Sequence, residues 1–176
     1  MLSVDENTAI QANARRYLDQ PPRAWGPRRR ELEYRRHGTV SLMAALDVHG
    51  GEALARDIAR KGAATFCDLF DVIERVVDPL MEIHLVLDNG SSHTAKATKR
   101  WLDAHPRFSA HYTPPHASWI NQVEFFFSIR ERKVIRNGSF TSLQDLLDKL
   151  VAFIASYDET AKPFRWTYAA DPLVAA

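Results

Sequence analysis

The chain has 176 residues, and its 23 lysines and arginines nearly balance 22 aspartates and glutamates, so the net charge of +1 singles out no class of partner. The length fits one domain, spanning residues 1–176, that can bury a core without a disulfide or structural metal. The 45% apolar content excludes a disordered chain, and one cysteine excludes an internal disulfide framework and indicates the cytosol. No stretch approaches the roughly 20 apolar residues of a membrane span.

The first residues and the segment after them differ in character. Alternation over residues 2–4 predicts a short strand that places Leu2 and Val4 on one face and Ser3 and Asp5 on the other. Residues 11–36 contain several proline and glycine breakers, and eight arginines there face three acids, a local charge of +5. We expect this segment to be a long surface loop, and such loops are usually functional.

Apolar periodicity predicts the rest of the chain. Residues 39–48 and 52–59 flank His-Gly-Gly and predict a hairpin. Residues 66–77 carry a helical pattern, with Thr65 as a candidate N-cap. Similar patterns predict strands at 83–87 and 108–112 and helices at 97–105, 118–135 and 142–158. This order predicts an α/β fold with a mixed sheet and helices on both faces.

Three acidic residues lie where a site could form. Asp5 ends or interrupts the first strand, Asp88 follows the apolar run 83–87, and Glu124 lies one turn into a helix. Strand ends in α/β sheets commonly carry functional groups. Each residue also has a structural explanation: Asp5 as a turn residue, Asp88 as part of an Asn-Gly turn, and Glu124 as part of a capping box with Asn121.

The surrounding sequence resembles a known family. The matching segments are VDENTAIQA around Asp5, HGTVSLMAALDV at 37–48, LVLDNGSSH at 85–93 and HYTPPHASWINQVEFFFSIRERKVIRNGSF at 111–140. They resemble the catalytic domain of mariner-like insertion-sequence transposases, members of the DDE superfamily. The resemblance covers nearly the whole chain, and its most specific part is Pro-Pro followed by Ser-Trp-Ile-Asn-Gln-Val-Glu.

The resemblance implies an RNase H-like fold with a central five-stranded mixed sheet. It also implies divalent-metal-dependent DNA cleavage and strand transfer at insertion-sequence ends, with Asp5, Asp88 and Glu124 as catalytic ligands of two Mg²⁺ or Mn²⁺ ions. Hard oxygen ligands suit these ions. Glu6 is the weaker candidate for the first ligand, because a regular strand points it to the opposite face.

Several other polar residues could support this site. His93 matches the family's Asp-Asn-x-x-x-His pattern and would orient a phosphate or a ligand, or it is simply a histidine in the first turn of a helix. Asn121 would lie behind the metals or serve as the N-cap. A zinc site built from His105, His111 and His116 is disfavoured, because these residues lack a cysteine partner and a matching helical spacing.

Two basic clusters suggest DNA contacts, although each could be an ordinary solvated face. Their members are Arg28, Arg29, Arg30, Arg35 and Arg36 in the first segment, and Arg130, Arg132 and Lys133 in the second. Phosphate contacts of this kind supply affinity without sequence choice. The resemblance implies binding of terminal-repeat and target DNA, a homodimer assembled on DNA, and a place in the bacterial cytoplasm with the nucleoid.

Two alternatives to an active transposase core stay open. Only four residues precede Asp5, so we expect the family's N-terminal helix-turn-helix region to be absent, and the first ten residues lack the features of a signal peptide. The chain could therefore be a catalytically silent remnant that binds DNA or dimerises. It could also be an RNase H-like nuclease acting on other nucleic acids. A Rossmann or P-loop enzyme is disfavoured, because neither glycine motif occurs.

Overall fold

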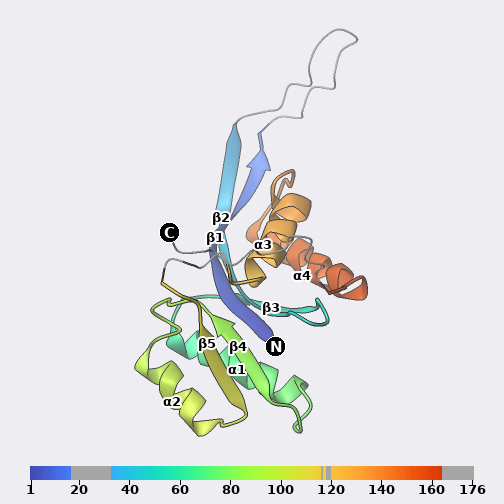
Figure 1. The fold of residues 1–176 in the computed structure, drawn as a ribbon. Helices are drawn as coiled ribbons and strands as arrows, with labels where there is room; N and C mark the ends of the chain where they lie inside the picture. Colours follow the sequence, from blue (N-terminus) through green and yellow to red (C-terminus); the bar gives the residue numbers. More distant parts are fainter. Residues whose placement is uncertain (17–32, 116, 118–119, 164–176) are drawn as a thin grey trace, which may run out of the picture.

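The computed structural model describes residues 1–16, 33–115, 117 and 120–163 (Figure 1). Within them, five strands form one sheet in the order β3-β2-β1-β4-β5. The strands are β1 (Leu2–Arg15), β2 (Tyr34–Asp47), β3 (Ala53–Ile58), β4 (Ile83–Leu87) and β5 (Phe108–Tyr112). β1, β2 and β3 are antiparallel, whereas β4 pairs parallel with both β1 and β5, which confirms the predicted mixed sheet.

Helices cover both faces of this sheet. They are α1 (Ala63–Val76), α2 (Lys96–Ala104), α3 (Val123–Arg130) with a π-helical continuation η2 (Glu131–Ile135), and α4 (Leu143–Glu159). Alternation along β2 decides which helices each face receives. Met43 packs with Phe70 of α1, whereas Ala44 packs with Phe126 of α3 on the other face. The predicted two-sided arrangement is therefore confirmed.

The helix starts differ in part from the prediction. Thr65 is not the N-cap of α1: Gly62 occupies that position without a side-chain capping bond, and the Thr65 hydroxyl donates to the carbonyl of Arg60 at 3.0 Å. Ser142 does cap α4, accepting from the backbone N–H of Asp145. No helix in the described part of the chain is both long enough and apolar enough to cross a bilayer.

The prediction of a loop over residues 11–36 is wrong at both ends. Residues 11–15 extend β1 and residues 34–36 extend β2, and the Arg16 N–H donates to the Glu33 carbonyl beyond them. We call residues 11–16 and 33–39 the arm; Figure 1 shows its strands running past the rest of the sheet. Ala12 on this stretch is buried, so the arm has an apolar side that its many arginines obscure in the sequence. Residues 17–32 lie outside the described residues.

A bulge in β1 determines which side of the arm is apolar. The register moves from Asn7↔Leu42 to Ile10↔Val40, so β1 holds one extra residue there, and Ala9 adopts a left-handed φ of 58°. One extra residue reverses the alternation of side chains. Ile10 therefore packs on the α4 side of the sheet, whereas Val4, an even-numbered residue before the bulge, packs on the α1 side.

Candidate functional site

The parallel pairing of β1 and β4 brings Asp5 and Asp88 together. Ser3 is opposite Val86 in the register, so Asp5 and Asp88, each two residues further on, reach the same level where β4 ends. β1 itself does not end there: it continues to Arg15, paired with β2 alone. Asp5 thus lies within a strand, but at the point where one side of that strand loses its neighbour.

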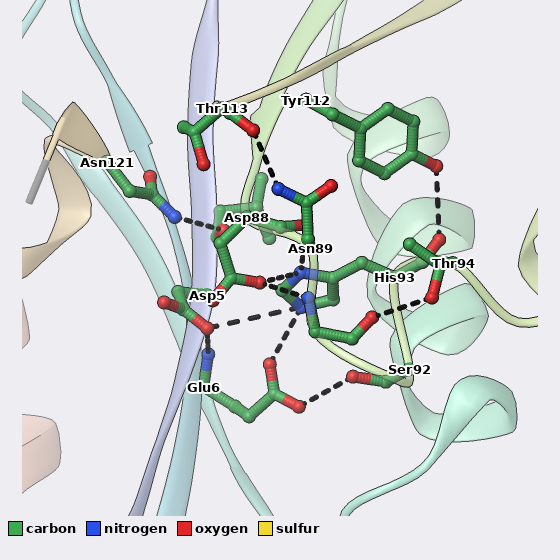
Figure 2. A network of polar contacts seen from close by, with 12 residues as sticks. Asp5, Glu6, Asp88, Asn89, Ser92, His93, Thr94, Tyr112, Thr113 and Asn121 are labelled. Atoms are coloured by element: carbon green, nitrogen blue, oxygen red, sulfur yellow. Dashed lines mark hydrogen bonds and ion pairs between the residues drawn. The ribbon is translucent and has the colours of Figure 1, made fainter. Parts of the chain in front are cut away.

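His93 joins the two carboxylates. Its Nδ1 lies 2.6 Å from Oδ1 of Asp88, and its Nε2 lies 2.8 Å from Oε2 of Glu6 and 4.0 Å from Oδ1 of Asp5 (Figure 2). The side chain is 1% exposed, and the ring stacks on Phe66 at 4.3 Å. Both ring nitrogens thus face carboxylate oxygens, an arrangement that favours the protonated ring, in which both nitrogens donate. One carboxylate oxygen of Asp5, one of Asp88 and a ring nitrogen of His93 lie within 4.8 Å of one another.

Glu6 is more central than the sequence indicated. It does point to the opposite face from Ser3, which meets Asn121, but there its carboxylate accepts from His93 and from the Ser92 hydroxyl at 2.8 Å. The Nζ of Lys61 lies 3.1 Å from its Oε1. Glu6, the residue after Asp5 on β1, therefore holds the His93 ring in place through its Nε2. No signal in the sequence pointed to Lys61.

The charges in this cluster shift its pKa values. Burial raises the pKa of Asp5 to about 7; the Glu6 backbone N–H opposes this shift and the charge of Asp88 adds to it. Burial would also raise the pKa of Glu6, but hydrogen bonds from His93 and Ser92 hold it well below its usual range. Burial acts to lower the pKa of His93, and the Glu6 hydrogen bond with the nearby carboxylates raises it overall. A divalent cation beside Asp5 and Asp88 would relieve their mutual repulsion.

The turn after β4 holds Asp88 in place. Oδ1 of Asp88 accepts from the backbone N–H of Gly90 at 2.8 Å, and the Asn89 side chain donates to the carbonyl of Thr113 at 2.7 Å. The Tyr112 hydroxyl donates to the carbonyl of His93 at 3.1 Å. The predicted Asn-Gly turn is therefore present, and it is tied to the end of β5 on one side and to His93 on the other.

Asn121 fastens the start of α3 to β1. It is fully buried, donates to the Val4 carbonyl at 2.9 Å and accepts from the Ser3 hydroxyl, which in turn accepts from the N–H of Val123 at 2.9 Å. The capping-box interpretation is wrong, because Gln122 occupies the N-cap position and makes no side-chain capping bond. Asn121 thus sets the position of α3 relative to the strand that carries Asp5.

Glu124 follows on the first turn of α3 but does not join the Asp5–Asp88–His93 cluster. Its side chain is exposed. Partial burial and the charge of Asp88 raise its pKa, while the charge of Arg130 opposes this. Glu124 therefore lies within the electrostatic range of Asp88 and on the same side of the sheet as Asn121.

The proposed DNA-contacting residues fall into three groups. Arg35, Arg36, Arg132 and Lys133 are exposed, whereas Arg28, Arg29 and Arg30 lie outside the described residues. Arg130 is 2% exposed, and its Nη2 donates to Oδ1 of Asn7 at 3.2 Å, so its assignment to a DNA-binding surface is wrong. It shares the helix face of Val123, Phe126 and Phe127, which packs on the sheet.

A groove lies along the outer part of the arm. It is lined by Ala14, Arg15, Arg16, Tyr34, Arg35, His37 and Thr141. Three arginines on one groove are a suitable surface for an anionic backbone. The groove and the carboxylate cluster are both built on β1, at opposite sides of the bulge.

The five-stranded mixed sheet with helices on both faces is the architecture of an RNase H-like core. Residues 1–147 match the family described as DDE superfamily endonuclease, and the chain belongs to this family. It is 30% identical over 104 residues to an insertion element IS630 uncharacterized 39 kDa protein of Shigella sonnei. That match spans 59% of this chain and 29% of the relative.

Solved structures agree on the fold. The Mos1 mariner paired-end complex with Mn superposes with a TM-score of 0.66 at 16% identity, covering 90% of this chain and 49% of that one. The Mos1 mariner transposase catalytic domain gives a TM-score of 0.61 at 13% identity, and the match covers 88% of this chain and 69% of that domain. The expected RNase H-like fold and the resemblance to mariner-like transposases are confirmed.

Proposed function

We propose that this chain is the catalytic core of an IS630-like transposase that cleaves DNA and transfers strands at insertion-element ends. The observation that carries the proposal is the cluster of Asp5 and Asp88 on adjacent parallel strands, with His93 between them. The insertion-element relative and the Mos1 complexes with transposon ends support it.

Asp5, Asp88 and Glu124 are the proposed ligands of two Mg²⁺ or Mn²⁺ ions. Their carboxylates form a hard-oxygen donor set. Burial, with a smaller contribution from the charge of Asp88, raises the pKa of Asp5, and a bound cation would favour its ionised form. Mos1 relatives crystallised with Mn and with Mg support this choice of metal. Two such ions would supply Lewis-acid activation of the attacking hydroxyl and stabilise the leaving oxygen.

The chain's own residues prepare this site. His93 donates to Asp88 and Glu6, which prevents Asp88 from turning away. Asn121 holds the start of α3 against β1, which fixes the helix that carries Glu124. Asp5 and Asp88 are held on rigid strands and a short turn, whereas Glu124 is exposed and free to approach them when ligand binds.

DNA and a second copy of the chain are the proposed partners. The exposed residues Arg35, Arg36, Arg132 and Lys133 would contact phosphates, and a homodimer would form on paired element ends. The Mos1 paired-end complex supports this arrangement.

The test is nicking of supercoiled plasmid and of terminal-repeat DNA in Mg²⁺ or Mn²⁺. We expect Asp88→Asn and Glu124→Gln each to lower cleavage at least 100-fold, because each removes a charged ligand. Asp103→Asn and Glu159→Gln, at exposed positions outside the cluster, are the matched controls. Unchanged cleavage by both site variants would reject the assignment.

Two further measurements separate the alternatives. A silent remnant would bind DNA in a salt-sensitive way but would bind no Mn²⁺ at Asp5 and Asp88 by calorimetry. A nuclease for other nucleic acids would cleave RNA or RNA–DNA hybrids faster than DNA in a substrate panel.

A further inference from the structure

A second cluster of metal-ligand groups lies where α1 meets the end of α2. Asp71 and Glu74 are one turn apart on α1, and His105 directly follows α2. Each offers one ligand atom within 4.8 Å of the other two. The side chains of His105 and Glu74 are 27% and 35% exposed, so the cluster is partly shielded but open to ions. It shares no residue with the Asp5–Asp88–His93 cluster.

Trp101 orients two of these three groups. The Nδ1 of His105 lies 2.7 Å from the Trp101 carbonyl oxygen, which can only accept, so Nδ1 carries a hydrogen and leaves Nε2 as the ligand nitrogen. The indole stacks flat on the imidazole at 3.7 Å and 10°. Its Nε1–H donates to Oδ1 of Asp71 at 2.7 Å. Metal-binding histidines are typically fixed by outer partners of this kind.

The spacing of the ligand atoms suits one shared ion. Nε2 of His105 lies 3.3 Å from Oε2 of Glu74. A charge-assisted hydrogen bond between such groups is shorter, about 2.7–2.9 Å. Two ligands that each lie about 2.0–2.1 Å from a tetrahedral ion are about 3.3–3.4 Å apart. The observed separation is therefore compatible with two ligands of one cation.

We propose that Asp71, Glu74 and His105 bind one divalent transition-metal cation of the Zn²⁺ class and thereby link α1 to α2. One nitrogen and two carboxylates suit Zn²⁺ better than Mg²⁺, which prefers oxygen ligands alone. Three protein ligands leave a fourth coordination position for water. This site differs from the disfavoured histidine set, because His105 is joined by carboxylates, while His111 instead contacts His84 at 3.0 Å.

The test uses the full chain with Asp5→Asn and Asp88→Asn, which removes the carboxylates of the other cluster. Calorimetry with Zn²⁺ is expected to give one saturable site that EDTA reverses and excess Mg²⁺ does not displace. Adding Glu74→Gln or His105→Gln should weaken binding at least tenfold, whereas Asp68→Asn, an exposed acid on the same helix, should leave it unchanged. Saturating Zn²⁺ should raise Tm by roughly 5 °C unless Glu74 or His105 is replaced.

Trp101 supplies a reporter that is local to the site. Cu²⁺ bound at His105 Nε2 should quench the fluorescence of the stacked indole, and His105→Gln should abolish that quenching. Absence of a saturable Zn²⁺ site would overturn the proposal. The proposal would also be overturned if the Glu74→Gln and His105→Gln chains bound Zn²⁺ as tightly as the chain that keeps both residues. His105 and Glu74 would then form only an ion pair. These binding measurements do not depend on whether the chain cleaves DNA, so the zinc proposal and the proposed function can fail separately.

Discussion

At the scale of single residues, Gly90 leaves very little room beside the Asp88 carboxylate. A Cβ at Gly90 would lie 2.9 Å from Oδ1 of Asp88 and 3.4 Å from Nδ1 of His93. The first distance is shorter than real Cβ contacts, so the carboxylate would have to shift. The absence of a side chain at Gly90 thus allows the Asp88–His93 pair to form.

We predict that Gly90→Ala lowers DNA cleavage by roughly 10- to 100-fold while the protein stays folded, because displacing a catalytic group by about 1 Å has effects of this size. Plasmid nicking and circular dichroism measure the two quantities. Gly62→Ala is the matched control, since a Cβ there meets no atom within 4 Å. Equal cleavage by both variants would show that the position of Asp88 is not critical.

At the scale of secondary-structure elements, α3 and η2 present two arginines to opposite environments. Arg130 is buried against Phe127, with its guanidinium carbon 6.0 Å from the ring centre, whereas Arg132 is exposed two residues later. Among the described residues, the Nε and Nη1 atoms of Arg130 have no hydrogen-bond partner. Burial lowers the pKa of Arg130, and the nearby charges of Glu131 and Glu124 oppose this shift.

We predict that Arg130→Ala lowers the free energy of unfolding by about 2–3 kcal/mol, because it leaves a cavity beside Phe127 and removes the bond to Asn7. Arg130→Met should recover most of this loss, since an apolar side chain of similar length fills the space and needs no hydrogen-bond partners. Arg132→Ala should change stability by less than about 0.5 kcal/mol. Urea denaturation measures all three; a stable Arg130→Ala protein with weakened DNA binding would contradict the structural role.

At the scale of the whole molecule, the near-zero net charge conceals an uneven distribution. Negative groups gather at Asp5, Glu6 and Asp88, while exposed arginines lie along the arm and after α3. The carboxylate cluster and the basic groove of the arm share β1, so a DNA strand could contact both. Phosphate contacts of this kind make affinity depend strongly on salt.

We predict that Arg35→Gln with Arg36→Gln lowers the slope of log K against log salt for DNA binding by about 1.8, because each lost phosphate contact contributes about 0.9. Fluorescence anisotropy over a salt series measures the slope. Lys99→Gln with Arg100→Gln removes two exposed charges from α2 and is the control. An identical reduction in both proteins would indicate a general charge effect and not a binding surface on the arm.

Much of the fold was predictable because its elements follow local periodicity. The helix over residues 142–158 and the strands at 83–87 and 108–112 match α4, β4 and β5 closely. The arm was missed because the outward-facing arginines outnumber its apolar residues, and a bulge at Ala9 interrupts the alternation. The helix predicted over residues 118–135 begins as α3 at Val123, and residues 118 and 119 lie outside the described residues.

The sequence alone determined the family resemblance, the α/β architecture with helices on both faces of a mixed sheet, and the candidate carboxylates, because motifs and apolar spacing are local properties of the chain. Tertiary structure alone decided that His93 lies between Asp88 and Glu6, although Glu6 and His93 are 87 positions apart. It also decided that Arg130 is buried while Arg132 is exposed. Burial and charge pairing depend on which faces of distant elements meet, and no local pattern encodes that meeting.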